Sequence, residues 1–378
     1  MTDLLRQEVA TAATTIVVKV GTRVLTNPDA TLDEVQISRL AEELNELTEA
    51  DRRVVLVSSG AVGAGMSHMG LSARPTDLAK LQAVAALGQT KLIELYDRTF
   101  RKHGRHAAQV LLTAEDLDDR TRYLNVRNTL LALLEYGAIP IINENDTVAI
   151  EELATTFGDN DRLAALVTNL LRAPLLIILS DVDGLYTGDP TLDSSSLVPL
   201  VTDLDDKIVA YAEDKQTGHS KGGMASKLRA ARIATVAGEN VIVASGHRPG
   251  ILRQIIDGEE VGTLFVAQGK SISPWKRWIG FSAQPRGKIV LDEGACKAIA
   301  QNGSSLLAIG ITATDGVFDK GDVVAICDLH GNELARGLTN YPTTEIERIK
   351  GLKSDRIAQV LGSCPYQEVV HRDNLVTL

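Results

Sequence analysis

The sequence predicts an α/β protein: a three-layer sandwich with a mostly parallel sheet, followed by a small, mostly β C-terminal domain. Up to about residue 265, short β-branched runs alternate with amphipathic stretches, a rhythm typical of a parallel sheet with helices on both faces. Beyond residue 287 the long helical patterns give way to short strands and turns. The length of 378 residues suits two domains.

The elements of the first part follow one another in a regular order. Its strands are short apolar runs rich in Val, Ile and Leu, the composition of strands buried on both faces. They cover residues 16–20, 54–57, 107–112, 139–142, 175–179 and 241–244. Between them, apolar residues recur at spacings of three and four, which predicts amphipathic helices. These helices cover residues 33–50, 77–102, 120–136, 160–171 and 224–238.

The pattern breaks at residues 267–286, a segment with two prolines, both tryptophans of the chain and no clear period. We therefore expect a first domain at 1–266, a linker at 267–286 and a second domain at 287–378. Strands of the second domain are predicted at 288–291, 321–327 and 333–337. Turn signals separate them at Asp315-Gly316, Lys320-Gly321 and His330-Gly331.

Composition and charge narrow the class of protein. Hydrophobic residues make up 44% and charged residues 23%, as in ordinary globular proteins, and the net charge of −10 disfavours general attraction to nucleic acid or membranes. The N-terminus lacks the apolar stretch of a signal peptide, so we expect a cytoplasmic protein. Cys296, Cys327 and Cys364 are widely spaced and no histidines cluster, which predicts buried free thiols and no zinc site.

Two lysines are placed like phosphate ligands. Lys19 stands near the end of the first strand, in VVKVGT, and Lys227 follows the glycine turn in KGGMASK. A compact ammonium beside turn glycines can bind phosphate oxygens together with backbone N–H groups. Lys19 alone would be read as a surface lysine. For the KGGMASK turn a purely structural role is less favoured, because the helix N-terminus and Lys227 would act on the same anion. That turn comprises Lys221, Gly222, Gly223, Met224, Ala225, Ser226 and Lys227.

The second strand ends in SSGAVGAG, a different kind of glycine turn. Its glycine order is neither the Rossmann fingerprint nor a Walker loop, which disfavours dinucleotide binding. A helix that begins here after Ser59 would offer the backbone N–H groups of Gly60 and Ala61 to an anionic group. Close packing of a helix on a strand also explains the glycines, but not the paired serines.

Two clusters of carboxylates and amides follow, in PIINENDTV and GDNDR. Asp and Asn are ordinary turn and cap residues, yet two such clusters exceed what capping requires. Amides such as that of Asn160 can donate to a carboxylate, while Asp146 or Asp161 accepts from an ammonium group. The combination favours a free amino acid as ligand.

A further strand ends in Ser180-Asp181, within LSDVDGLYTGDP. Asp181 can be read as a simple turn cap. Alternatively, its carboxylate lies between Lys19 and Lys227 and keeps both ammonium groups protonated and directed at the phosphates.

In this order, VVKVGT, SSGAVGAG, INENDTV, GDND, SDVDGLYTGDP and GGMASK resemble the amino acid kinase superfamily, within it most closely the kinases of the γ-carboxylate of glutamate. The C-terminal part resembles a PUA domain. The resemblance implies that Lys19 and Lys227 contact ATP and the transferring phosphoryl group, that Asp181 organises them, and that Ser180 lies at the nucleotide. Ser59, Asp146 and Asn160 match glutamate-binding positions, and residues 221–227 match the ATP loop. Ser180 and Lys221 both depart from the threonine that is frequent in the family.

The resemblance further implies Mg²⁺ with ATP, L-glutamate as acceptor in the first step of proline biosynthesis, and feedback inhibition by L-proline. Other acceptors used by the same fold remain alternatives, although the acidic clusters favour a free ammonium group. We also expect a homo-oligomer, a dimer or a tetramer, for which the long helix at 77–102 could supply the interface. RNA binding by the PUA-like domain is the alternative of another class, and the scattered basic residues disfavour it.

Overall fold

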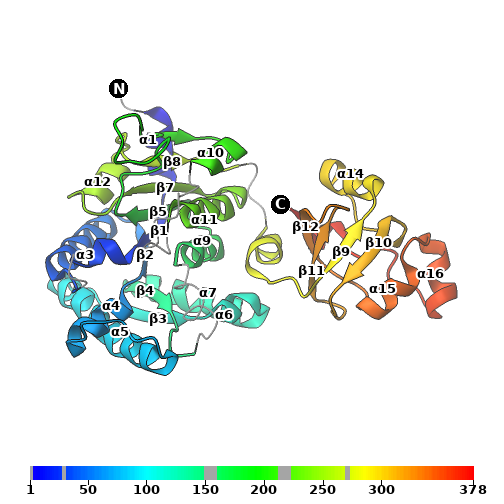
Figure 1. Cartoon of the computed structure of the whole chain (residues 1–378), viewed down its shortest axis with the longest axis horizontal. Helices are drawn as coiled ribbons and strands as arrows, with labels where there is room; N and C mark the ends of the chain where they lie inside the picture. The colour runs from blue at the N-terminus through cyan, green and yellow to red at the C-terminus, as the bar shows by residue number, and fades with distance from the viewer. Residues whose placement is uncertain (1–2, 28–30, 149–159, 212–222, 269–272) are drawn as a thin grey trace. The chain divides into compact units, whose positions relative to one another are not determined.

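The computed structural model describes residues 3–27, 31–148, 160–211, 223–268 and 273–378. The chain divides into two compact units, each with its own sheet (Figure 1). The larger unit contains Met1–Asp116 and Tyr123–Ser271, and the smaller contains Leu117–Arg122 and Ile272–Leu378. The segment predicted as a linker contains a short helix, α13 (Pro274–Arg277), and a π-helical turn (Trp278–Ser282).

The sheet of the larger unit has eight strands in the order β3-β4-β2-β1-β5-β7-β8-β6. All neighbouring strands run parallel except β7 and β8, which are antiparallel. The strands are β1 (Thr15–Val20), β2 (Arg53–Ser58), β3 (Ala107–Leu112), β4 (Ile139–Glu144), β5 (Leu175–Ser180), β6 (Leu200–Val201), β7 (Asn240–Ser245) and β8 (Thr263–Phe265). The prediction of a mostly parallel α/β sheet is confirmed. Two strands were not predicted, β6 and β8, because two or three residues are too few to show a period.

Helices cover both faces of this sheet (Figure 1). On one face, α1 (Leu4–Ala12), α3 (Glu34–Glu49), α5 (Leu78–Phe100) and α12 (Ile251–Ile256) share a single apolar core with the strands. On the other face, α9 (Asn160–Leu171) packs against β1 and β5, and α11 (Met224–Val236) packs against α9 and β7. The other helices described between β1 and β7 are α2 (Thr22–Leu25), α4 (Ala61–Met69), α6 (Ala114–Asp118), α7 (Arg120–Glu135) and α10 (Asp206–Ala210). The end of α6 and the start of α7 lie in Leu117–Arg122 and so belong to the smaller unit.

Strand β1 shows how the sheet aims its side chains. All of its residues are buried, as expected for a central strand covered on both faces. Val18 and Val20 belong to the core beneath α3 and α5. Because successive side chains point to opposite faces, Lys19 points to the face that α9 and α11 cover.

Helices α4 and α5 touch through their backbones. A Cβ atom added to Gly88 would lie 1.8 Å from the carbonyl oxygen of Ala61, and one added to Gly65 would lie 1.9 Å from that of Val84. Gly60, which precedes α4, has a φ of 103°, a conformation that side chains disfavour. These glycines therefore fix where α4 begins relative to the end of β2.

The smaller unit is built on a five-stranded sheet in the order β10-β9-β11-β12-β13, in which only β9 and β11 run parallel. Its strands are β9 (Gly287–Leu291), β10 (Ile311–Asp315), β11 (Val323–Cys327), β12 (Glu333–Leu338) and β13 (Leu375–Thr377). Three short helices accompany the sheet, α14 (Glu293–Asn302), α15 (Thr343–Ile349) and α16 (Ser354–Leu361). The sequence did not reveal these helices, because each is too short for a clear helical period.

The cysteines of this unit are free, as expected, but their burial differs from the prediction. Cys327 is buried in β11, whereas Cys296 and Cys364 are only half-buried at the margin of the core. Burial of all three thiols was therefore a wrong expectation. Apolar pattern alone does not distinguish the centre of a small core from its edge.

Candidate active site

Several of the candidate residues lie at the carboxyl ends of the central parallel strands. Lys19 lies near the end of β1, where its strand pairs with β2 and β5. Ser58 ends β2 and Ser180 ends β5, so Ser59 and Asp181 are the first residues beyond these two strands. Parallel strands end at the same edge of a sheet, which brings together side chains that are distant in the sequence.

A buried carboxylate joins the two lysines. Lys19 Nζ lies 2.6 Å from Oδ1 of Asp161, and Lys227 Nζ lies 3.3 Å from Oδ2 of the same residue. All three residues are buried, with exposed fractions of 5%, 6% and 2% for Lys19, Lys227 and Asp161. Burial by itself would raise the pKa of Asp161, but the two ammonium groups outweigh it and hold the pKa below its usual value. The cluster thus presents two positive charges that share one negative charge.

Asp181 does not occupy the place expected of it. The carboxylate between the two lysines is Asp161, at the start of α9, whereas Asp181 accepts a hydrogen bond from Arg23 at 2.8 Å and from Ser180 at 3.1 Å. Burial would raise the pKa of Asp181, but the hydrogen bond from Arg23 contributes to lowering it. Asp161 meets the lysines because α9 packs on the face of the sheet to which Lys19 points. Asp181 instead lies in the loop beyond β5.

Next to the lysines and Asp161 lies a chain of buried, hydrogen-bonded amides. Asn160 Nδ2 donates to Ser59 Oγ at 2.9 Å and to Asn143 Oδ1 at 3.0 Å. Asn143 Nδ2 donates in turn to Oε1 of Gln89 at 2.9 Å. The chain therefore connects the end of β2, the start of α9, the end of β4 and the middle of α5. Ser59 and Asn160, both predicted as ligand-binding residues, are direct neighbours.

Asp146 lies in the turn after β4 and is paired electrostatically with Arg74. Burial raises the pKa of Asp146 to about 6, although the positive charge of Arg74 opposes this shift. Burial likewise lowers the pKa of Arg74, and Asp146 opposes that change. A carboxylate that titrates near neutral pH can change its charge under physiological conditions.

Two helices, α4 and α11, begin at the predicted glycine turns, and the first backbone N–H groups of a helix have no partner within it. Gly60 and Ala61 open α4 immediately after Ser59, with Gly60 as the N-terminal flanking residue. Gly223 precedes α11, whose first four residues are Met224, Ala225, Ser226 and Lys227. Ser226 and Lys227 are buried, Met224 is half-buried and Ala225 is exposed. Lys221 and Gly222, the first two residues predicted for this turn, lie outside the described residues.

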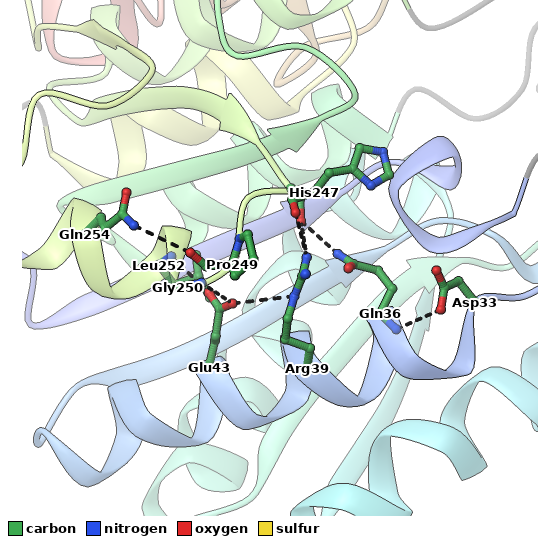
Figure 2. Close-up of polar contacts among 10 residues, drawn as sticks. Asp33, Gln36, Arg39, Glu43, His247, Pro249, Gly250, Leu252 and Gln254 are labelled. Carbon is green, nitrogen blue, oxygen red and sulfur yellow. Dashed lines mark hydrogen bonds and ion pairs between the residues drawn. The ribbon is translucent and has the colours of Figure 1, made fainter.

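The loop that follows β7 is held against α3 by a second polar cluster (Figure 2). Gln36 and Arg39 donate to the carbonyl of Gly246 at 2.7 and 3.1 Å, and the carboxylate of Glu43 accepts from the backbone N–H groups of Gly250 and Leu252 at 2.9 and 3.1 Å. Burial raises the pKa of Glu43, and the two backbone hydrogen bonds oppose the shift. The Gly246 N–H donates to the carbonyl of Ser180 at 2.8 Å, which connects this loop to the end of β5.

Three polar residues near the predicted site were not singled out by sequence reasoning: Arg23, Arg74 and Gln89. Arg23 and Arg74 belong to surface segments in which arginine is unremarkable. Gln89 had a detectable signal, because a polar residue occupies a position of α5 that the helical period assigns to the buried face, between Ala85 and Leu92.

Among the described residues, no three or more His, Cys, Asp or Glu side chains are grouped so that they could hold a metal ion. In the same part of the chain, no helix combines the length and apolar character that a membrane crossing requires.

Comparison with known proteins shows the family of the chain. The Amino acid kinase family matches residues 14–245, and the PUA domain matches residues 287–361. The chain is 48% identical over 372 residues to a glutamate 5-kinase of Rhodopirellula baltica, with coverage of 98% of this chain and 96% of that protein. It is 47% identical over 364 residues to a glutamate 5-kinase of Moorella thermoacetica, with coverage of 96% of each. Because the family match covers most of the larger unit and the relatives match over nearly the whole chain, the chain belongs to the amino acid kinase family and carries a C-terminal PUA domain.

Proposed function

We propose that this chain transfers the γ-phosphoryl group of ATP to the γ-carboxylate of L-glutamate, giving L-glutamyl 5-phosphate and ADP, the first step of proline biosynthesis. The observation that carries this proposal is the pair of buried lysines bridged by Asp161, next to the Ser59–Asn160 hydrogen bond. Identity of 45–48% over nearly the whole chain to proteins named glutamate 5-kinase supports glutamate as the acceptor.

The mechanism we infer needs no general base, because the attacking carboxylate is already an anionic nucleophile. Its γ-carboxylate oxygen forms a bond to the γ-phosphorus as the bond to the β,γ-bridging oxygen breaks, and ADP leaves with that electron pair. Lys19 and Lys227 would neutralise the charge on the transferring group, and Asp161 would hold both ammonium groups in place. Catalysis then depends on positioning and charge stabilisation.

We divide the remaining residues between a nucleotide side and an amino acid side of the site. On the nucleotide side we place Ser180, Asp181 and the turn at residues 221–227. On the amino acid side we place Ser59, Asp146 and Asn160, together with the N–H groups of Gly60 and Ala61. Asp146 would accept from the ammonium group and Ser59 would donate to a carboxylate.

Mg²⁺ fits this site as a companion of ATP. The described residues hold no cluster of three metal-binding side chains, and Mg²⁺ commonly keeps waters and phosphate oxygens as its ligands. Bound with ATP, it would supply charge neutralisation on the phosphate oxygens. Asp181, exposed and hydrogen-bonded by Ser180, is a carboxylate on the nucleotide side that could contact Mg²⁺ or its waters.

L-proline is a cyclic relative of glutamate with the same α-carboxylate and a similar ammonium group. We therefore propose that it binds at or over the amino acid side of the site and inhibits the enzyme. A homo-oligomer in the cytoplasm remains part of the same proposal.

The test is ADP release with Mg-ATP and each of L-glutamate, N-acetyl-L-glutamate, L-aspartate and UMP, with and without L-proline. We expect turnover with L-glutamate alone and suppression by proline. Turnover with a different acceptor would refute glutamate as the substrate, and turnover with glutamate that proline does not affect would refute the proposed inhibition.

A further inference from the structure

The amide chain on the amino acid side begins at Gln89, a residue in the middle of α5 that belongs to none of the motifs. Gln89 is 6% exposed, and its Oε1 accepts from Nδ2 of Asn143 at 2.9 Å. The neighbouring Gly88 packs on the carbonyl of Ala61, so this turn of α5 also touches the start of α4. Gln89 is thus held at a rigid contact between two helices.

The direction of the hydrogen bonds in this chain is fixed by the backbone. Oδ1 of Asn143 accepts from the backbone N–H of Glu144 at 2.9 Å, and a backbone N–H can only donate. The oxygen of the Asn143 side chain must therefore face Glu144 and Asn160, and its nitrogen must face Gln89. Gln89 consequently has to present its oxygen to Asn143.

This direction determines what the site offers to a ligand. Asn160 uses its Nδ2 to donate to both Asn143 and Ser59, so its Oδ1 is left as an acceptor. Within the described part of the chain, this buried oxygen has no hydrogen-bond partner. Ser59 Oγ accepts from Asn160, which leaves its hydroxyl hydrogen to donate. The site thus presents an acceptor for an ammonium group beside a donor for a carboxylate.

Packing alone does not account for an amide at position 89. Its Nε2 is a buried donor without a hydrogen-bond partner among the described residues, a situation that destabilises a folded protein. An apolar side chain of the same length would fill the space without this penalty. The amide is explained by what its oxygen does for Asn143.

We infer that Gln89 is a positioning residue for the amino acid substrate: through Asn143 it orients Asn160 and Ser59, and so sets the donor and acceptor pattern of the site. This inference rests on the proposed phosphorylation of glutamate. It adds a residue of α5, outside every motif, to the determinants of amino acid affinity.

The test is the Gln89→Met variant, which keeps the length of the side chain and removes the amide oxygen. Loss of one hydrogen bond in the chain is expected to raise KM for L-glutamate about tenfold. KM for ATP should stay within about twofold, because the change acts through the amino acid side. Gln82→Met, the same change at a half-buried position two turns earlier on α5, is the matched control and should leave both constants unchanged.

The outcomes separate this inference from the proposed function. An unaltered protein that phosphorylates glutamate, together with a Gln89→Met variant whose KM for glutamate is unchanged, would overturn the inference and leave the proposed function intact. A lower melting temperature with unchanged KM would overturn it too, because it would make Gln89 purely structural. An unaltered protein without activity on glutamate would overturn both.

A second variant covers the case in which Gln89→Met does not fold. Gln89→Glu keeps an acceptor oxygen toward Asn143, and burial favours the protonated carboxyl, which like the amide has a carbonyl oxygen that accepts. KM for glutamate is expected to stay within about threefold of the unaltered protein. A tenfold increase in this variant would contradict the role assigned to the amide oxygen.

Discussion

At the scale of single residues, the site is a set of buried charges and amides joined by ion pairs and hydrogen bonds. Asp161 is the centre of this set, because it forms ion pairs with both lysines and is itself only 2% exposed. Buried charges are tolerated in proteins when they are paired, and Asp161 is the anion that pairs with both ammonium groups. The same arrangement is what a transferring phosphoryl group would require.

Replacement of Lys227 by alanine tests the charge at the transferring group. We expect turnover to fall by about 10²–10³, the usual effect of removing one donor that stabilises a transition state. Steady-state ADP release with glutamate measures this change. Lys207→Ala, at an exposed position of α10, is the control and should retain full turnover. A Lys227→Ala variant within a few-fold of the unaltered protein would refute the catalytic role of Lys227.

The raised pKa of Asp146 predicts a pH dependence. Burial places this pKa at about 6, so Asp146 ionises as the pH rises through that value. The ionised form would accept from the ammonium group of glutamate, and KM for glutamate should therefore fall between about pH 5 and 7. In Asp146→Asn this dependence should disappear, with a higher KM at pH 7.5. An unchanged pH profile in the variant would exclude Asp146 as its origin.

The stability of the folded protein should fall as Asp146 ionises, whereas the affinity for glutamate should rise. The pKa of Asp146 in the folded protein is raised above the unfolded value of 3.8, so the folded state binds this proton more tightly. The contribution of Asp146 to stability is therefore greatest below pH 3.8 and is lost as the pH rises to about 6.

At the scale of elements, the carboxyl edge of the sheet is supported from both sides. Helices α4 and α5 meet through glycines, which fixes the start of α4 behind Ser59. Helix α3 holds the loop after β7 through Gln36, Arg39 and Glu43 (Figure 2). The same loop hydrogen-bonds to the end of β5, from the Gly246 N–H to the carbonyl of Ser180. Rigid elements on both sides are what positions side chains within the small tolerances that catalysis requires.

The variant Glu43→Ala tests this support. It removes the acceptor of the Gly250 and Leu252 N–H groups, and leaving a buried donor unpaired typically costs about 1–3 kcal/mol. We expect the free energy of unfolding of the larger unit in urea to fall by about 2 kcal/mol. Glu46→Ala, at an exposed position of the same helix, should change it by less than about 0.5 kcal/mol. Equal effects of the two changes would show that the cluster does not stabilise the loop.

At the scale of the whole molecule, each of the two compact units has a hydrophobic core of its own among the described residues. One lies between the eight-stranded sheet and α1, α3, α5 and α12, and the other lies within the smaller unit. Residues of the smaller unit include Leu117–Arg122, which come from the sequence between β3 and β4. Two cores of this size can unfold as separate cooperative units.

Calorimetry provides the test at this scale. We expect two unfolding transitions, of which Mg-ATP raises only the one that belongs to the larger unit, because a ligand stabilises the unit that binds it. The melting temperature of the other transition should not change with the concentration of Mg-ATP. A single transition that Mg-ATP shifts as a whole would show that the two units unfold as one.

Local pattern determined much of this protein. The β-branched runs and helical periods predicted the central strands and the long helices to within one or two residues, because these elements are long enough to show their period. The strand ends also indicated where Lys19, Ser59 and Ser180 would meet, since parallel strands share one functional edge. Short elements such as β8 and α14–α16 escaped prediction because few residues carry little periodic signal.

Only the tertiary structure decided which groups contact one another. Sequence reasoning placed Asp181 between the lysines, but the packing of α9 puts Asp161 there and leaves Asp181 to Arg23. The contact of Gln89 with Asn143 depends on how closely α5 approaches β4. The sequence indicates the central buried strands and the polar residues that stand at their ends. Which side chain meets which depends on the packing of helices on the sheet, since residues distant along the chain become neighbours only there.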